Sequence, residues 1–207
     1  MSLKIGVVGA TGNVGREMLS ILSEKGFKSD DVFAIASSRS EGIKVPFGED
    51  EITVTSLDKF NPKEIEIALF SAGGDISKEW APKFAKAGCI VIDNSSHFRM
   101  DPEVPLIVPQ VNSEDLKTIK KNIIANPNCS TAQLVITLKP LHDLYTIKRI
   151  IVSTYQSVSG GGKAPMDELI EQTKLALDGK KINSKNFTKQ IAFNAIPHID
   201  VFSDDGY

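Results

Sequence analysis

The sequence has little cysteine, little net charge and no long apolar run. Two cysteines among 207 residues are too few for a disulfide framework, so a reducing, cytoplasmic setting is the default expectation. A formal net charge of -2 provides no electrostatic reason to expect nucleic acid or an acidic membrane as a partner. No apolar run approaches the roughly 20 residues of a membrane helix, and the N-terminal apolar stretch is too short for a signal peptide.

The composition that remains is that of an ordinary globular protein, 41% hydrophobic and 24% charged. In the first half, short apolar runs alternate with amphipathic stretches. They predict strands over 4–8, 31–36, 66–70, 89–93 and 123–126 and helices over 13–26 and 76–88. The first helix is expected to bury Val14, Met18, Ile21 and Leu22 on one face. Strands that alternate with helices in this way predict an α/β fold, a Rossmann-like parallel sheet covered on both faces.

The pattern changes near residue 130. We expect a helix over 131–144, which Pro140 should kink or end, and then a long strand over 147–158 with one packed face. A further helix over 165–179 would have Pro165 in its first turn and Gly179 at its stop, ahead of a polar loop and a strand-like stretch over 193–202. The predicted domains are therefore 1–130, a nucleotide-binding domain, and 131–207, the start of a second domain.

Three glycines follow the first predicted strand and open the first helix. Gly9, Gly12 and Gly15 have the spacing G-x-x-G-x-x-G, which differs from the common dinucleotide fingerprint G-x-G-x-x-G. Glycines at this position let the backbone approach a pyrophosphate at the helix N-terminus. The alternative is a tight strand-to-helix turn that binds no ligand.

The residues after the second strand indicate which nucleotide is bound. NAD-specific folds place an acidic residue there to bond the ribose 2′-hydroxyl, but "SSRS" has no carboxylate before Glu41. A guanidinium grips phosphate oxygens bidentately, so Arg39, flanked by Ser37 and Ser40, favours NADP. The alternative is that Arg39 is a solvated loop residue.

The stretch "NPNCSTAQ" places a cysteine where a strand gives way to a helix. Helix N-termini stabilise anions and therefore favour a thiolate, and Asn128, Ser130 and Thr131 are available as caps for the helix that Cys129 would open. A nucleophile, a redox sensor and simple filler all remain open at this point. Cys89 begins a buried strand and is expected to be inert packing.

Several motifs occur in an order that specifies a family. They are "GATGNVG", "SSRS", "FSAGG", "DNSSHFRM", "VPQVN", "NPNCSTAQ", "STYQSVSGGG" and "FNAIPHID". Together they resemble the aspartate-semialdehyde dehydrogenases from residue 3 to the last residue. N-acetyl-glutamyl-phosphate reductases share the chemistry, but their cysteine is usually followed by an aromatic residue, which "NCSTAQ" lacks.

The resemblance implies a reaction. Cys129 would attack the acyl phosphate of L-aspartyl 4-phosphate, phosphate would leave, and NADPH would reduce the thioester to aspartate semialdehyde. The reaction belongs to the biosynthesis of lysine through diaminopimelate, and of threonine, methionine and isoleucine. The resemblance also makes Arg99 a phosphate ligand, Gln156 a substrate ligand and Asn128 a group that orients the substrate carbonyl. For Arg99 the alternative is a surface ion pair.

The candidate cofactor contacts come from the glycine loop, the serine-rich turn and the resemblance taken together. They are Gly9, Thr11, Gly12, Asn13, Val14, Ser37, Arg39, Ser40, Ser159 and Gly160. The resemblance implies a homodimer or homotetramer that acts on small molecules, with no nucleic acid, membrane or metal involved.

The sequence departs from the family pattern at its end. The resemblance assigns the acid/base histidine, a substrate-binding arginine and a phosphate-binding lysine to positions beyond residue 207, and His97, His142 and His198 match no catalytic motif. We therefore interpret the chain as a Rossmann-like domain followed by the truncated start of an α+β catalytic and dimerisation domain, inactive by itself. A non-catalytic NADP-binding sensor and, less well, a cysteine hydrolase are the alternatives. A histidine-bearing continuation past Tyr207 would distinguish enzyme from sensor.

Overall fold

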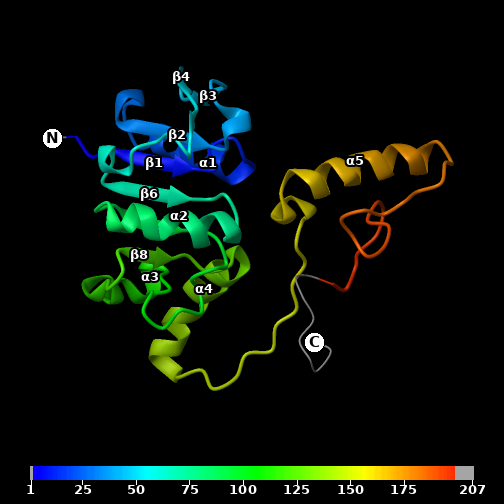
Figure 1. The fold of residues 1–207 in the computed structure, drawn as a ribbon. Coiled ribbons are helices and arrows are strands. Elements are labelled where there is room, and N and C mark those ends of the chain that lie inside the picture. Colours follow the sequence, from blue (N-terminus) through cyan, green and yellow to red (C-terminus); the bar gives the residue numbers. More distant parts are fainter. Residues whose placement is uncertain (1, 199–207) are drawn as a thin grey trace. The chain divides into compact units, whose positions relative to one another are not determined.

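The computed structural model describes residues 2–198. The chain divides into two compact units, the first ending at Thr154 and the second beginning at Tyr155 (Figure 1). Each unit is described by itself. Among the described residues, none of the helices combines the length and the apolarity needed to cross a bilayer.

A parallel sheet organises the first unit. Its strands are β1 (Ile5–Val8), β2 (Val32–Ala36), β5 (Thr55–Ser56), β6 (Ile67–Phe70), β7 (Ile90–Asp93) and β8 (Ile123–Ala125). They form a six-stranded sheet in the order β5-β2-β1-β6-β7-β8, and each pairing is parallel. The predicted strands and the Rossmann-like parallel sheet are confirmed.

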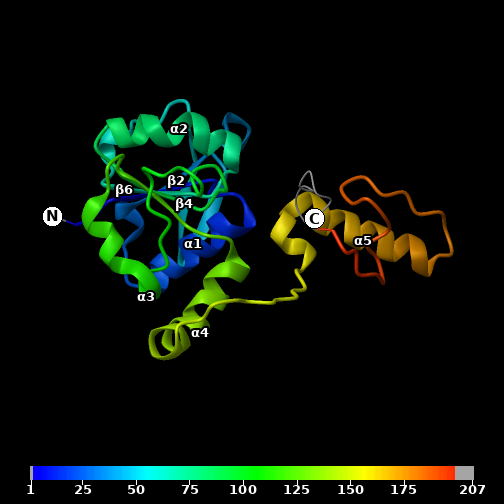
Figure 2. The ribbon, with the colours of Figure 1, turned by 90° about the horizontal axis from the view of Figure 1, so that it is seen from below.

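Helices cover the two faces of this sheet. Figure 2 shows α2 (Gly74–Lys86) above the sheet and α1 (Asn13–Glu24) below it. Each helix packs on its own cluster of buried residues: Phe84 of α2 lies in one, with Phe60 and Phe70, and Leu19 of α1 lies in the other. Burying a side chain of this size contributes about 1.5–3 kcal/mol to the free energy of folding, so the two clusters supply most of the hydrophobic stabilisation of the unit.

The buried face of α1 differs from the predicted one. Gly15, Leu19 and Leu22 are buried, whereas Val14 and Ile21 are 48% and 40% exposed. The reason is the close approach of Gly15 to the chain: a Cβ on Gly15 would lie 2.2 Å from the carbonyl oxygen of Gly9. This contact rotates the helix so that its glycine faces the sheet.

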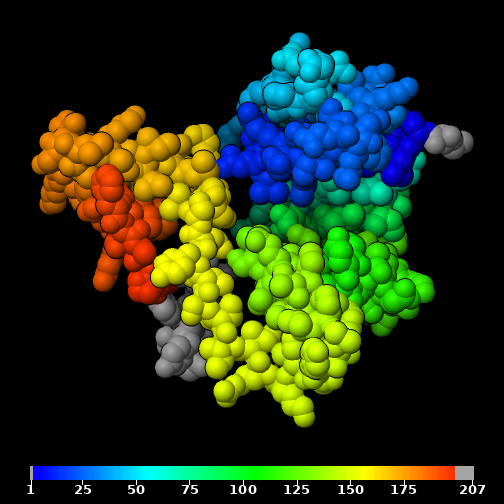
Figure 3. Space-filling model, turned by 180° about the vertical axis from the view of Figure 1, so that it is seen from behind, coloured from blue at the N-terminus to red at the C-terminus, as the bar shows by residue number. Residues whose placement is uncertain are grey.

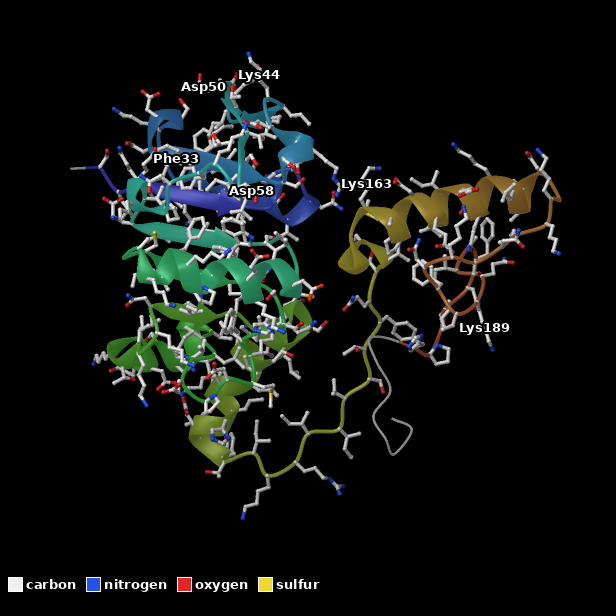
Figure 4. The ribbon with its side chains drawn as sticks, viewed as in Figure 1. Phe33, Lys44, Asp50, Asp58, Lys163 and Lys189 are labelled. Atoms are coloured by element: carbon white, nitrogen blue, oxygen red, sulfur yellow. The ribbon has the colours of Figure 1, made fainter. Side chains whose placement is uncertain are left out.

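A hairpin that the sequence reasoning missed completes the α1 side. Strands β3 (Lys44–Phe47) and β4 (Asp50–Thr53) pair antiparallel and bury Val45, Phe47 and Ile52 against the core. In Figure 4, Lys44 and Asp50 mark the hairpin at the rim of the unit. Alternation with period two is present in the sequence here, but it spans only a few residues on each side of the turn.

The remaining elements of the first unit are short turns and one long helix. They are the 3-10 turns at Ser29–Asp31, Ser38–Ser40, Pro62–Glu64 and Ser113–Thr118, helix α3 (Pro109–Asn112) and helix α4 (Cys129–Tyr145). The helix predicted over 131–144 is confirmed, but Pro140 does not end it: the missing proline N–H removes a single backbone bond, and α4 continues to Tyr145. Figure 3 shows α4 in yellow-green at the surface of the unit.

The predicted strand over 147–158 is also wrong. Residues 147–157 belong to no helix or strand, and Ile151 and Tyr155 are 83% and 94% exposed. A strand requires a neighbour for its backbone groups, and no described strand lies beside this segment. The strand-like stretch over 193–202 contains no strand at 193–198, and its remaining residues lie outside the described part of the chain.

The second unit is built on one helix and a loop tied to it. A 3-10 turn at Val158–Gly161 leads to α5 (Lys163–Leu177), which has Pro165 in its first turn and Gly179 just beyond its end, as predicted. Buried Glu168 accepts four hydrogen bonds, from Gln172 Nε2 and from the Lys185 N–H, the Asn186 N–H and Asn186 Nδ2. Burial by itself raises the pKa of Glu168, but these bonds outweigh it and hold the pKa below its ordinary value.

We predict that Glu168→Gln destabilises the second unit in a pH-dependent way. Glu168 is charged in the folded and unfolded states above about pH 4.3, so the full effect of about 1–3 kcal/mol is expected there. The effect should disappear as the pH falls through the lowered pKa of the folded state, because protonation then breaks the same bonds in the wild type. Urea unfolding followed by far-ultraviolet circular dichroism at several pH values measures it.

The matched control is Glu171→Gln on the same helix, whose carboxylate lies at the surface 3.7 Å from Lys185 Nζ. Equal destabilisation by both changes, or a wild-type advantage that persists unchanged into acid, would contradict the prediction.

Candidate active site

The parallel sheet brings separate sequence motifs to one edge. Because each strand pairing is parallel, the segments that follow the strands lie at the same carboxyl edge. The strand order diverges between β1 and β6, which is where open α/β sheets bind their ligands. The glycine loop follows β1, "SSRS" follows β2, Arg99 follows β7 and Cys129 follows β8.

The glycine loop fits the close approach of a phosphate group. Gly9 has φ of 92°, and a Cβ there would lie 2.6 Å from the carbonyl oxygen of Ser71, in the segment after β6. Gly12 is exposed and is the N-cap of α1, with no side-chain hydrogen bond at the cap. The loop is held in place by the Gly9 and Ala10 N–H groups, which both donate to the carbonyl of Ile35. The result is a backbone cradle open at the helix N-terminus, beside exposed Asn13 and Val14 and half-buried Thr11.

Arg39 lies next to this cradle in the sheet order. The turn Ser38–Ser40 directly follows β2, the neighbour of β1, and Ser37 is its N-cap. Arg39 is exposed, and its guanidinium forms no ion pair or hydrogen bond with the described residues. A free cation between exposed or half-exposed serines is suited to a phosphate monoester.

Cys129 is the first residue of α4, as the sequence predicted. Its thiol is exposed, and the side chain of Asn128 accepts a hydrogen bond of 2.9 Å from the Ser130 N–H, so Asn128 is the N-cap. The side-chain oxygen Oδ1 of Asn128 is therefore used at the helix end. The helix N-terminus places its partial positive charge beside this exposed thiol.

Arg99 is bound to the turn that leads to Cys129. Its Nε donates to the carbonyl of Asn126 at 2.9 Å and its Nη2 to the carbonyl of Asn94 at 3.3 Å. The side chains of the same two residues meet, with Asn126 Nδ2 donating to Asn94 Oδ1 at 2.6 Å. Arg99 is half-buried and has no carboxylate partner in the described part of the chain, so the surface ion pair considered above is not what it forms. Its remaining N–H groups and its full charge are available to an anion.

Asn94 and Asn126, whose carbonyls hold the Arg99 guanidinium, were not singled out from the sequence. Both follow buried strands within quoted motifs, and polar side chains at strand ends were the available signal. Their pairing joins segments that lie 32 residues apart, which no local pattern reports.

The other predicted residues, Gln156, Ser159 and Gly160, belong to the second unit. Ser157 caps the turn at Val158–Gly161, and its Oγ lies 3.0 Å from Ser159 Oγ. A Cβ on Gly160 would lie 2.4 Å from Gln156 Nε2, so the absence of a side chain at 160 makes room for the Gln156 amide. Gln156, Ser159 and Gly160 are all exposed within their unit.

The second thiol has the opposite environment. Cys89 is fully buried, and its Sγ donates to the carbonyls of Pro62 and Ile65 at 2.9 and 3.3 Å. Burial, and then the charge of Glu66, raises the pKa of Cys89. It is inert packing, as expected from the sequence.

The histidines of the first unit are not close to Cys129 along the chain. His142 is in the last turn of α4, about 20 Å along the helix axis from Cys129 at the usual rise per residue. The ring of His97 packs edge-on against Phe98 with centroids 4.6 Å apart. Among residues 2–198 there is no group of three or more histidine, cysteine or acidic side chains that could hold a metal ion.

Comparisons with known proteins place these features in a family. Residues 4–119 match the model "Semialdehyde dehydrogenase, NAD binding domain", and residues 138–207 match "Semialdehyde dehydrogenase, dimerisation domain". An aspartate-semialdehyde dehydrogenase of Aquifex aeolicus is 57% identical over 100% of this chain and 62% of its own length. The chain thus spans about three fifths of the length of the curated relatives it matches.

Two solved structures are also similar. The aspartate semialdehyde dehydrogenase II of Vibrio cholerae, complexed with ASA, has a TM-score of 0.95 and 49% identity over 100% of this chain and 62% of that chain. The aspartate semialdehyde dehydrogenase of Candida albicans, with NADP, has a TM-score of 0.59 and 32% identity over 70% of this chain and 48% of that chain.

We predict that iodoacetamide alkylates Cys129 much faster than Cys89 at neutral pH. Cys129 is exposed at a helix N-terminus, whereas Cys89 is buried and its pKa is raised, so little thiolate forms there. Peptide mass mapping after brief labelling measures both sites. Cys129→Ser provides the background rate of Cys89, and preferential labelling of Cys89 in the wild type would overturn the assignment.

Proposed function

The chain belongs to the semialdehyde dehydrogenase family, and from this we propose that it carries the nucleophile and cofactor site of an NADP-dependent aspartate-semialdehyde dehydrogenase. The reaction is the reductive dephosphorylation of L-aspartyl 4-phosphate to L-aspartate 4-semialdehyde, on the route to lysine, diaminopimelate, threonine, methionine and isoleucine. One observation carries the proposal most directly. An exposed thiol at a helix N-terminus stands next to a turn that binds an arginine with no carboxylate partner among the described residues.

The residues of the chain account for the acyl-transfer half of the reaction. The thiolate of Cys129 attacks the acyl carbon, the S–C bond forms, the bond between that carbon and the bridging oxygen breaks, and phosphate leaves with the electron pair. Arg99 holds the phosphoryl group, because its guanidinium is fixed by two carbonyls and keeps N–H groups free for oxygen ligands. Asn128 and Gln156 contribute to substrate binding.

The cofactor site is assigned to the cradle after β1 and the turn after β2. Gly9, Gly12 and the start of α1 would hold the pyrophosphate, and Arg39 with Ser37 and Ser40 would hold the 2′-phosphate. Bound NADPH would supply the hydride that reduces the thioester to the aldehyde level. The similar Candida albicans enzyme, whose structure was solved with NADP, supports the choice of this nucleotide.

The domain division, the assembly and the compartment complete the proposal. We place the dinucleotide-binding domain at 1–130 and the start of the catalytic and dimerisation domain at 131–207, consistent with family matches that end at 119 and begin at 138. The proposed assembly is a homodimer or homotetramer, and the match to a dimerisation domain supports oligomerisation. The reaction needs Cys129 as a free thiol, which suits the reducing cytoplasm.

We predict that Arg39→Ala in the full-length protein weakens NADPH binding by about 1.5–3 kcal/mol and leaves NADH binding little changed. The lost interaction is a charged hydrogen bond to the 2′-phosphate, which NADH does not have. Fluorescence titration with both nucleotides measures it. Lys44→Ala, on the β3–β4 hairpin and paired with Glu51, controls for the loss of one positive charge. Equal losses for NADPH and NADH would show that Arg39 does not contact the 2′-phosphate.

We also predict that a polypeptide limited to residues 1–207 does not turn over substrate. A positioned acid/base contributes about 10²–10⁴-fold, and the resemblance assigns the histidine that performs this role to a later position. The assay follows NADPH formation from aspartate semialdehyde, phosphate and NADP, with a full-length homologue as the positive control. Turnover at the rate of that homologue would mean that the acid/base lies within these residues.

A further inference from the structure

A buried carboxylate lies at the end of β7, directly before the segment that carries Arg99. Asp93 is 0% exposed and accepts three hydrogen bonds: from Ser77 Oγ at 2.7 Å, from Ser95 Oγ at 2.7 Å and from the Ser95 N–H at 3.1 Å. A buried charge is costly unless it is paired or well hydrogen-bonded. Neither oxygen of Asp93 meets Arg99 or any other cation among the described residues, so the hydrogen bonds to its side chain come from serines alone.

The bonds made by Asp93 lead in two directions. Ser77 lies in α2, so its bond joins the carboxylate to the helix that covers the sheet. Ser95 lies in the turn after β7, and its Oγ also accepts a bond of 3.1 Å from the His97 N–H. The Ser95 hydroxyl thus connects the Asp93 carboxylate to the backbone of His97, two residues further along the turn.

The turn held in this way ends at Arg99. The Arg99 N–H donates to the carbonyl of Ser96 at 3.3 Å, and its guanidinium donates to the carbonyls of Asn94 and Asn126. Each group that aims the guanidinium is therefore part of the turn itself or of the segment that leads to Cys129. On its β7 side the turn is anchored by Asp93 with Ser95, and also by the Asn94 N–H, which donates to the carbonyl of Phe70, while Phe98 is buried in the cluster of α2.

We propose that Asp93 and Ser95 are positioning residues for the reaction: they hold the turn over residues 94–99 so that Arg99 meets the phosphate group next to Cys129. The proposal rests on the proposed function and deepens it, because it names residues that determine affinity for phosphate without touching it. It also explains why the Asp93 carboxylate accepts its hydrogen bonds from two serines and not from an arginine. If Asp93 paired with Arg99, it would neutralise the charge that binds phosphate.

The alternative is that Asp93 only ties β7 to α2, and the two serines separate these roles. Ser95→Ala removes the Ser95 Oγ bond and the His97 bond on the turn side. Ser77→Ala removes a bond of the same length to the same carboxylate on the helix side. Ser95→Ala removes two bonds and Ser77→Ala one, so Ser95→Ala should lower thermal stability more, and it is KM for phosphate that separates the two roles. Ser95→Thr keeps the hydroxyl and serves as the conservative rescue.

The experiment measures steady-state kinetics of the full-length protein with aspartate semialdehyde, inorganic phosphate and NADP. We expect Ser95→Ala to raise KM for phosphate about tenfold. This factor corresponds to the loss of about one charged hydrogen bond between a misplaced Arg99 and the phosphate. We expect KM for NADP to stay within about twofold, and Ser77→Ala to leave KM for phosphate within the same limit. Ser95→Thr should recover most of the loss. Equal effects of the two alanine variants, or an unchanged KM for phosphate in Ser95→Ala, would overturn the proposal.

A second measurement keeps the two proposals apart. In protein with ¹⁵N-labelled arginine, the Nε–H signal of Arg99 reports its bond to the Asn126 carbonyl. Ser95→Ala should shift this signal and speed its exchange with water, whereas Ser77→Ala should leave both unchanged. Absence of turnover in the wild type would refute the proposed function, and the Nε–H signal would then decide the positioning proposal. An unshifted signal in Ser95→Ala would refute it.

Discussion

The parallel pairing of β1 with both β2 and β6 is the constraint on which the first unit depends. It places the carboxyl ends of the strands at one edge, and it makes the chain leave β1 where the sheet diverges. Gly9 is required at this point because its backbone passes the segment after β6 too closely for a side chain. The carbonyl of Ile35 fixes the start of the loop through the Gly9 and Ala10 N–H groups, and the first turn of α1 opens directly beyond it.

The carboxyl edge collects positive charge that no described carboxylate neutralises. The net charge of the chain is -2, so composition does not reveal this edge. The N-termini of α1 and α4 add partial positive charge next to Arg39 and Arg99. The neighbouring acidic side chains have other partners: Glu41 pairs with Lys59, Asp101 pairs with Lys121, and buried Asp93 is hydrogen-bonded by serines. Phosphate and thiolate, the two anions of the proposed reaction, are both suited to such an environment.

The described part of the chain also leaves apolar surface uncovered. Helix α4 has no buried residue, and Leu144 and Tyr145 at its end are 74% and 78% exposed. The extended segment that follows exposes Ile151 and Tyr155. Exposed apolar side chains of this kind are typical of residues that pack against another part of a protein or a partner. It lies where the match to a dimerisation domain begins, so it agrees with the proposed assembly.

Local pattern by itself determined five of the six strands of the sheet (β5 was missed), the glycine turn and the place of Cys129 at a helix start, because apolar runs, glycines and caps act over a few residues. Tertiary structure decided the rest. The segment over 147–158 has the alternation of a strand, but a strand also needs a neighbour. Arg99 finds its carbonyl partner 27 residues away, and Glu168 finds its donors at 185 and 186. Such contacts depend on which segments the fold brings side by side, and no short stretch of sequence contains that information.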